Sequence, residues 1–321
     1  MAFNMSNTKN EMPHQDPNIR RNNFDEVALG YSEEAAILEA KRCIQCKNPK
    51  CIEGCPVQIN IPLFIKKVSE GEFEEAYKII TRTSSLPAIC GRVCPQESQC
   101  EKLCARGIKG EAVAIGRLER FVADWHNKHI KEEVIKPELN GYKVAIVGSG
   151  PAGLTCAAFL ARSGVDVTIY EKHSSLGGVI EHGIPEFRLE RSILDSTINK
   201  ILELGIDVKL NQELGKDFSL EDLEKTYDAI FLSFGKNISS KMGIDGEELN
   251  GVYGGNELLE YNVCDKAVVL ICSDDLQNSE NACSEERFLI YKDDMIEKLK
   301  LFIEKGKWLF NIKSRKAVEI W

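Results

Sequence analysis

Cysteine is the residue that most constrains how this chain folds. The chain has 12 cysteines in 321 residues, and most of them lie between positions 43 and 104. Those form two groups of four, and a proline follows the last cysteine of the first group (Pro56) and the second cysteine of the second group (Pro95). The two groups are Cys43, Cys46, Cys51 and Cys55, then Cys90, Cys94, Cys100 and Cys104.

The spacing within these groups resembles that of bacterial ferredoxins, in which close cysteines hold one iron–sulfur cluster and a further cysteine beside a proline binds the other. Eight thiols are the number that two four-iron clusters require, so the pattern predicts two 4Fe–4S clusters. The ferredoxin logic assigns Cys43, Cys46, Cys51 and Cys104 to one cluster and Cys55, Cys90, Cys94 and Cys100 to the other.

Zinc and disulfides are the alternatives for such a set of cysteines. Zinc sites usually combine two separated C-x2-C pairs, often with a histidine, but the nearest histidines, His14 and His126, lie outside the cysteine stretch. Disulfides are typical of small secreted chains. The spacing therefore favours iron–sulfur clusters.

Composition describes an ordinary soluble protein. The net charge of −9 and the pI near 5.3 argue against non-specific binding to nucleic acid or to an anionic membrane surface. The first 16 residues are polar, without the apolar core of a signal peptide, and no apolar run reaches the roughly 18 residues of a membrane helix. We expect a cytoplasmic chain that binds neither nucleic acid nor membranes.

The first 140 residues read as helical. We expect an extended arm over residues 1–24, then an all-α domain with the two clusters over residues 25–132. No strand pattern precedes residue 140. The expected helices cover residues 33–42, capped by Ser32, and residues 61–68, 73–81 and 113–126.

Beyond a linker at residues 131–140, the apolar pattern becomes that of alternating strands and helices. This predicts an α/β, Rossmann-like domain over residues 140–262. The expected strands are 143–147, 166–170, 207–210 and a buried strand at 229–233; the expected helices are 154–163, 189–204 and 220–225.

A glycine motif lies between the first strand and the first helix of this domain. Gly148 permits a tight turn, Gly150 lets the backbone approach a pyrophosphate, and Gly153 lets helix and strand pack closely. Glu171 ends the next strand, where its carboxylate can accept hydrogen bonds from ribose hydroxyls. Pro151 is compatible with the first turn of the helix. The motif predicts a dinucleotide site; on physical grounds FAD and NAD both remain open, and Glu171 disfavours a 2′-phosphate.

Five strings together resemble the family of the small (β) subunit of NADPH-dependent glutamate synthase, which includes the N-terminal half of dihydropyrimidine dehydrogenase. The match runs from about Asn23 to about Asn262. The strings are CIQCKNPKCIEGCPVQINIPLFI (from Cys43), AICGRVCPQESQCEKLC (from Ala88), AIGRLERFVADW (from Ala114), VAIVGSGPAGL (from Val144) and LGGVIEHGIPEFRL (from Leu176).

The resemblance implies two low-potential clusters joined to an FAD domain. For both clusters it implies the cysteine ligands that the spacing predicts. In the dihydropyrimidine dehydrogenase branch of the family, however, a glutamine is the fourth ligand of the second cluster. Glu119 falls at that place, and Cys90 is the simpler choice. Arg188 is implied to line the flavin side, but an ordinary surface arginine would explain this residue equally well. The residues implied to bind FAD are Gly148, Ser149, Gly150, Pro151, Ala152, Gly153, Glu171, Gly178 and Arg188.

Electrons in this family pass from NADPH to FAD and through the clusters to a larger catalytic or electron-accepting partner. This chain departs from the family where a second glycine motif, for NADPH, is expected. Ser273, Asp274 and Asp275 follow the candidate strand there, and acidic side chains repel a pyrophosphate. NADPH binding is therefore doubtful, and residues 263–321 form a divergent tail without an assigned role. Two hypotheses stand: an electron-transfer oxidoreductase subunit, and a truncated, non-catalytic relative that binds clusters and FAD without oxidising NADPH.

Overall fold

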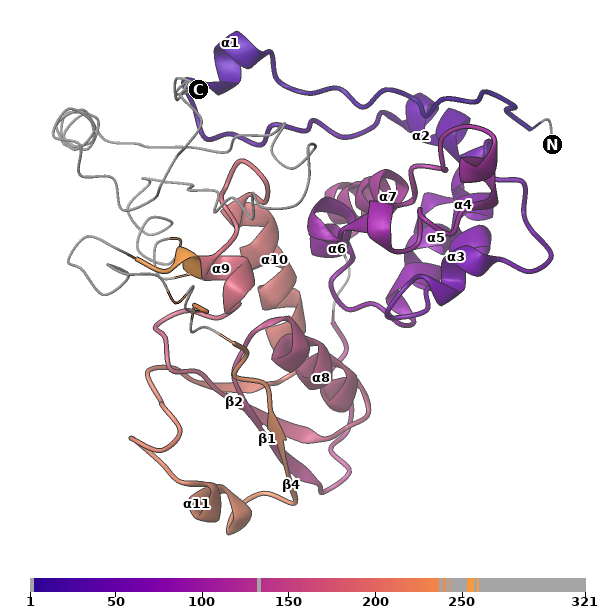
Figure 1. Ribbon diagram of the computed structural model, residues 1–321. Coiled ribbons are helices and arrows are strands. Elements are labelled where there is room, and N and C mark those ends of the chain that lie inside the picture. The colour runs from indigo at the N-terminus through magenta and orange to yellow at the C-terminus, as the bar shows by residue number, and fades with distance from the viewer. Residues whose placement is uncertain are drawn as a thin grey trace, which may run out of the picture. The chain divides into compact units, whose positions relative to one another are not determined.

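The computed structural model describes residues 3–131, 134–236, 239, 240, 243, 253–256 and 259 (Figure 1). The chain divides into two compact units, Met1–Glu181 with Glu186–Phe234, and His182–Pro185 with Gly235–Trp321. The first unit contains both predicted sites. We call residues 3–131 the cysteine segment and residues 140–234 the sheet segment.

The cysteine segment consists of helices and loops, with no β-strand among its described residues. One isolated antiparallel bridge joins His14 to Ala28. The helices are α1 (Pro17–Arg20), α2 (Glu33–Ala40), α3 (Lys50–Glu53), α4 (Ile61–Glu70), α5 (Phe73–Thr81), α6 (Pro87–Val93) and α7 (Ile115–His129), with 3-10 turns at Gln96–Ser98 and Ala105–Ile108.

Local sequence explains where several of these helices begin and end. The Ser32 side chain accepts the Ala35 N–H at the start of α2, as a good N-cap does. Gly71 ends α4 in the left-handed conformation, with φ of 78°, which glycine adopts without a steric penalty. Helix α5 covers the predicted residues 73–81. The predictions for α2, α4 and α7 are confirmed with ends shifted by a few residues.

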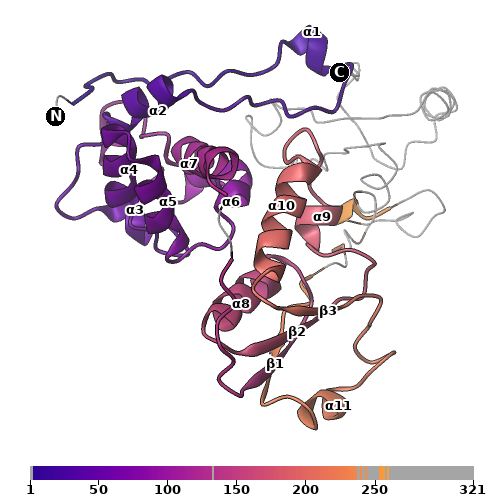
Figure 2. The same ribbon diagram turned by 180° about the vertical axis from the view of Figure 1, so that it is seen from behind.

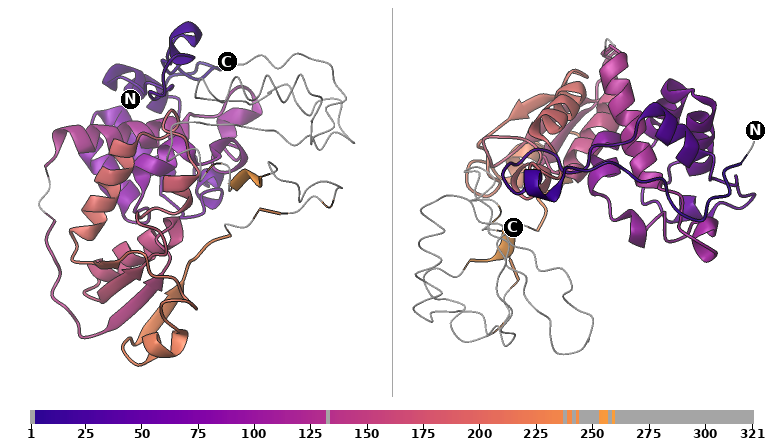
Figure 3. Two further views of the ribbon diagram at one scale, coloured as in Figure 1. Left: turned by 90° about the vertical axis from the view of Figure 1, so that its left-hand side faces the viewer. Right: turned by 90° about the horizontal axis from the view of Figure 1, so that it is seen from above.

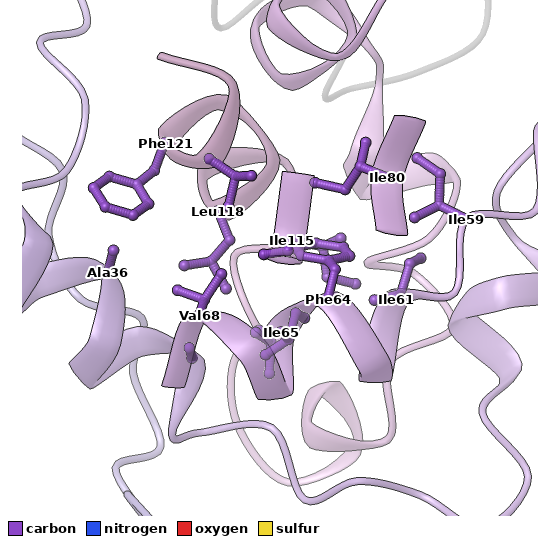
Figure 4. Packing of buried hydrophobic residues seen from close by; sticks show 14 of the residues in the cluster. Ala36, Ile59, Ile61, Phe64, Ile65, Val68, Ile80, Ile115, Leu118 and Phe121 are labelled. Carbon is purple, nitrogen blue, oxygen red and sulfur yellow. The ribbon is translucent and has the colours of Figure 1, made fainter. Parts of the chain in front are cut away.

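Helices α4, α5 and α7 bury one shared apolar core (Figure 4). Phe64, Val68 and Leu118 are fully buried, and Figure 4 shows their side chains converging with those of the neighbouring helices. Phe73 and Phe121 meet edge to face at 4.9 Å between ring centroids. Each such side chain contributes roughly 1.5–3 kcal/mol by leaving water. This core holds in place the helices that precede and follow the cysteine loops.

Three short helices of this segment differ from the sequence expectation. The arm was expected to be extended, but Pro17–Arg20 forms α1, capped by the Asp16 side chain. Helices α3 and α6 fall within cysteine stretches that lie outside the helices expected from the sequence. All three have four to seven residues, which is too short for a helical repeat of apolar positions to show.

The sheet segment forms a parallel sheet with the order β3-β2-β1-β4; β3, β2 and β1 are labelled in Figure 2, and β4 is labelled beside β1 in Figure 1. Val144 in β1 pairs with Val167 in β2 on one side and with Ala229 in β4 on the other. The strands lie side by side in further views as well (Figure 3). The strands are β1 (Lys143–Val147), β2 (Asp166–Tyr170), β3 (Asp207–Lys209) and β4 (Ala229–Leu232); the helices are α8 (Pro151–Arg162), α9 (Val179–His182), α10 (Arg191–Leu202) and α11 (Leu220–Glu224).

The predictions for β1 and β2 are confirmed at both ends, and the last four of the five residues in each strand are buried. Helix α8 packs against both strands and α10 packs against α8. The expectation of a buried strand at residues 229–233 is wrong in one respect. Strand β4 is at the edge of the described sheet, and Phe231 and Leu232 remain 38% and 46% exposed, because no described element covers them.

Several expectations lie outside the described residues. These are part of the linker, the strand and acidic turn expected after residue 265, and the whole divergent tail, residues 263–321. Among the described helices, none combines the length and the apolar character that crossing a membrane requires.

Candidate cluster and dinucleotide sites

Four of the predicted cluster ligands come together at the end of α2. Cys43 follows that helix, Cys51 lies in α3, and Cys46 and Cys104 interact electrostatically with both. Burial, with a further contribution from neighbouring thiols, raises the pKa of Cys43 to about 11 and that of Cys51 to about 12. We call these four residues the first thiol group.

A buried ion pair holds the end of α2 beside this group. Arg42 donates to the Glu39 carboxylate at 2.6 Å, and both side chains are fully buried. The same Glu39 oxygen accepts the Ala114 N–H, and Arg42 also donates to the Glu111 carbonyl. Breaking such a pair leaves a buried charge, which costs about 3–5 kcal/mol. The pair therefore ties Cys43 to the segment that follows Cys104.

The loop of the first thiol group contains a strained residue. Gln45, between Cys43 and Cys46, has a φ of 50°, a conformation that costs a non-glycine residue about 1 kcal/mol or more. Its side-chain amide donates to the Cys43 sulfur at 3.4 Å. Such a bond stabilises a thiolate, which is the form that binds metal.

A second set of thiols assembles where Gly54 meets the chain near Cys100. A methyl group at Gly54 would lie 2.8 Å from the Gln99 carbonyl oxygen and 3.1 Å from the Cys100 Cα atom. The bare glycine therefore brings the neighbouring Cys55 close to Cys100, and the two thiols interact. Burial and nearby acidic groups raise the pKa of Cys100 to about 12.

Gly91 likewise permits a close backbone approach, which positions Cys90 and Cys94. Helix α6 lies so close to α7 that a methyl group at Gly91 would be 2.4 Å from the Arg120 backbone nitrogen. This contact places Cys90 and Cys94 beside Glu119 of α7. The Cys90 thiol donates to Cys94, which raises the pKa of Cys90 and lowers that of Cys94 to about 7. We call Cys55, Cys90, Cys94, Cys100 and Glu119 the second thiol group.

Glu119 has the features of an unused ligand. Its side chain is buried, and its Oε1 atom has no hydrogen-bond partner among the described residues. Burial, and then the nearby Cys94, raises the pKa of Glu119 to about 8. A buried oxygen without a partner is costly, and an iron atom would satisfy it.

The donor sets suit iron–sulfur clusters. Each thiol group offers at least four potential ligands, and the members are cysteines apart from Glu119. Within the described part of the chain, no three histidine, cysteine or carboxylate side chains are arranged to hold a single metal ion.

The glycine motif forms the predicted tight turn between β1 and α8. Gly148 has a φ of 100°, and a methyl group there would lie 2.5 Å from the Ser233 carbonyl oxygen. A methyl group at Gly153 would lie 2.0 Å from the Gly148 carbonyl oxygen. At Gly150 a methyl group would meet nothing within 4 Å. Two glycines are thus required by packing, and the third leaves open space where a pyrophosphate would approach.

Helix α8 presents its N-terminus to this space. Pro151 is its first residue and Ala152 its second, and Gly150 is the N-cap without a side-chain hydrogen bond. The first N–H groups of a helix lack intrahelical partners and attract anions. Gly178 lies against the turn, since its methyl group would be 3.0 Å from the Gly150 Cα atom.

Glu171 organises the turn from within the protein. One carboxylate oxygen accepts both the N–H and the hydroxyl of Ser149, at 2.9 and 2.6 Å, and the other accepts the His173 N–H at 3.0 Å. Burial acts to raise the pKa of Glu171, but these hydrogen bonds outweigh it, and the pKa lies below the usual value. A carboxylate can accept about four hydrogen bonds, and three are made here within the protein.

Arg188 is the remaining residue that the sequence predicts for this site. The Arg188 side chain is exposed and has no hydrogen bond or ion pair with other described residues. Conversely, the sequence analysis missed Gly54, Gly91 and the internal role of Ser149. A glycine next to a ligand cysteine was the available signal for Gly54, but nothing in the sequence shows which backbone it approaches.

Two family profiles match the chain, one over each segment. Residues 20–131 match the family described as dihydropyrimidine dehydrogenase domain II, 4Fe-4S cluster. Residues 146–191 match the family described as NAD(P)-binding Rossmann-like domain. The chain therefore carries an iron–sulfur domain followed by a Rossmann-like dinucleotide-binding domain.

Curated relatives cover both segments together. The glutamate synthase [NADPH] small chain of Escherichia coli K12 is 38% identical over 78% of this chain and 53% of its own length. The corresponding small chain of Halomonas elongata is 37% identical over 79% and 55%. The NAD-dependent dihydropyrimidine dehydrogenase subunit PreT of Salmonella typhimurium is 38% identical over 69% and 54%. The chain spans about half the length of these relatives, and its predicted resemblance to them is confirmed.

Proposed function

We propose, from the likeness to glutamate synthase small chains and PreT, that this chain is an electron-transfer component of an oxidoreductase. In this proposal, electrons pass from NAD(P)H to FAD and through two 4Fe–4S clusters to a larger partner subunit. The observation that supports it most directly is the convergence of the cysteines into two separate groups. The proposed domains are residues 25–132 for the clusters and 140–262 for FAD.

The first thiol group, Cys43, Cys46, Cys51 and Cys104, would hold one cluster. Cys55, Cys94 and Cys100 would hold the other, with a fourth ligand from Cys90 or Glu119. Cys90 follows from spacing alone. The unpaired Oε1 atom of Glu119 favours that residue, because cluster binding would satisfy a buried oxygen that otherwise has no partner.

Paired variants distinguish these two ligands. Glu119→Ala is expected to remove the second cluster, about four of the eight irons, whereas Cys90→Ser is expected to retain them. The readouts are bound iron and sulfide after anaerobic reconstitution. Iron loss in Cys90→Ser alone would assign the ligand to Cys90 instead.

The glycine turn would hold FAD. Its residues Gly148, Ser149, Gly150, Pro151, Ala152 and Gly153 surround the free N-terminus of α8, with Gly178 beside them. Glu171 stays ionised at neutral pH because its pKa is lowered, and this charge would repel a 2′-phosphate. The site thus suits the adenosine ribose of FAD better than that of NADP.

Bound FAD would supply the exchange between two-electron and one-electron chemistry. The chain's own residues have simpler tasks. Ser149 and Glu171 shape the turn, the α8 N-terminus would compensate phosphate charge, and the thiolates would compensate iron charge.

The second hypothesis is a relative that carries clusters and FAD without oxidising NADPH. The acidic residues Asp274 and Asp275, which stand in the sequence where the second glycine motif was expected, favour it. NADPH-dependent bleaching of bound flavin separates the two: bleaching supports the electron-transfer role, and its absence from fully loaded protein supports the second hypothesis.

Cofactor content tests both hypotheses at once. Anaerobic reconstitution is expected to give about eight irons, about eight sulfides and one flavin per chain. A colourless protein that binds zinc instead would overturn the proposed function.

A further inference from the structure

The surface around the first thiol group has its own character. Ile44 follows Cys43 directly and Leu103 precedes Cys104, and these two apolar side chains are 41% and 43% exposed. Lys47 follows Cys46, Lys102 precedes Leu103, and both lysines are exposed. Because Cys43, Cys46 and Cys104 meet, these four neighbours lie around one thiol group. We call them the first-group rim.

The rim is basic in an acidic chain. The chain as a whole has a net charge of −9, yet neither Lys47 nor Lys102 forms an ion pair with a carboxylate in the described part of the chain. The exposed carboxylate that follows in α3, Glu53, is paired with Lys50 at 2.7 Å. The rim therefore presents two lysines without a carboxylate partner next to exposed apolar side chains, and such charges can steer a partner of opposite charge.

The second thiol group is more enclosed. Three of its five members, Cys55, Cys100 and Glu119, are buried, and Cys90 and Cys94 are partly exposed. All four members of the first thiol group are partly exposed. Arg92, the cation nearest Cys94 in sequence, is engaged in ion pairs with Glu26 and Asp124. A cluster in the first thiol group would thus be the one closer to solvent and to an external acceptor.

We propose that the first-group rim is the docking surface at which an acidic one-electron redox protein takes electrons from the first cluster. This inference rests on the proposed function and adds to it the exit point and the charge of the partner. Each transfer moves one electron from the reduced cluster to one ferric iron of the acceptor, which becomes ferrous. No bond is made or broken and no proton moves.

Binding provides the first test, independent of turnover. The probes are an acidic plant-type [2Fe–2S] ferredoxin and basic cytochrome c, titrated against the reconstituted protein at low ionic strength. The rim predicts that the ferredoxin binds and that Lys47→Glu with Lys102→Glu weakens this binding at least tenfold. The control variant, Lys216→Glu with Lys225→Glu, makes the same charge change on exposed lysines of the sheet segment. It is expected to change the affinity for the ferredoxin less than twofold.

Small oxidants provide the second test. For dithionite-reduced protein, ferricyanide oxidation is expected to slow as salt rises, because the local positive charge attracts this anion. If the overall charge of −9 governed the reaction instead, ferricyanide would be repelled and its rate would rise with salt. Lys47→Glu with Lys102→Glu should reverse the salt dependence. Ile44→Ser with Leu103→Ser should weaken ferredoxin binding about tenfold and leave the ferricyanide rate unchanged, since a small ion needs no apolar contact.

The outcomes separate this inference from the proposed function. Iron content is measured first, and protein without clusters would overturn both. Protein with about eight irons that binds cytochrome c rather than ferredoxin, or that reacts faster with ferricyanide as salt rises, would overturn the docking surface alone. Equal effects of the two lysine pairs would also overturn it.

Discussion

The glycine turn of the sheet segment draws its residues from one stretch of chain, Gly148 to Glu171, whereas the first thiol group joins Cys43 to Cys104. The glycine turn connects β1 directly to α8. Glu171, which follows the neighbouring strand β2, accepts a hydrogen bond from Ser149 in the turn. Helix packing builds the thiol groups, through close backbone approaches at Gly54 and Gly91. The comparison teaches that substitutions at residues that are not ligands, such as Gly54 and Gly91, can disrupt the thiol groups, while the turn depends mainly on its own residues.

The largest expected effect is a loss of iron from the cysteine segment without any loss of flavin from the sheet segment. Cys94→Ser removes a ligand of the second thiol group, so we expect about four of eight irons to be lost with flavin retained. Iron, sulfide and flavin assays on the same sample measure this. Cys43→Ser serves as the matched variant and is expected to remove the other four irons. Retention of all irons in either variant would contradict the ligand assignment.

A substitution that leaves every candidate ligand in place sharpens the comparison. Gly91→Ala forces a methyl group against the α7 backbone, which should destabilise the chain by about 1–3 kcal/mol and lower occupancy of the second cluster. Urea unfolding and iron content measure the two effects. Gly107→Ala is the control, because its methyl group would find ordinary contacts, the nearest at 3.7 Å. Equal behaviour of the two variants would show that the α6–α7 approach is unimportant.

The converse change should affect the sheet segment alone. Gly153→Ala pushes α8 away from the Gly148 carbonyl and is expected to weaken FAD binding roughly tenfold, equivalent to about 1.4 kcal/mol. Fluorescence titration of the flavin gives the affinity. The iron content should stay unchanged, and its loss in this variant would mean that the two sites do not form independently.

The smallest effect concerns protonation of Glu171. Hydrogen bonds lower the pKa of Glu171 from the usual 4.5, so its stabilisation is complete above pH 4.5 and is lost as the pH falls through the lowered value. Glu171→Gln should therefore cost about 1 kcal/mol at pH 7, and the difference should shrink below pH 4.5. Urea unfolding of both proteins between pH 7 and 3 measures it. A difference that is constant with pH would show that the charge of Glu171 does not matter.

The sequence alone predicted those structural features that depend on residues close together along the chain. Strands β1 and β2, helix α5, the Ser32 cap and the glycine turn follow from short-range periodicity and hydrogen bonding. The number and spacing of the cysteines likewise pointed to two groups of ligands.

Only the tertiary structure decided how those parts meet. It revealed α6 and its contact with α7, the unpaired Glu119 oxygen beside Cys94, and the exposure of β4 at the sheet edge. Each of these depends on which distant backbone approaches which, and a linear pattern carries no record of such distances. Burial and close approach are properties of the folded chain, because they arise only when segments far apart in sequence share the same space.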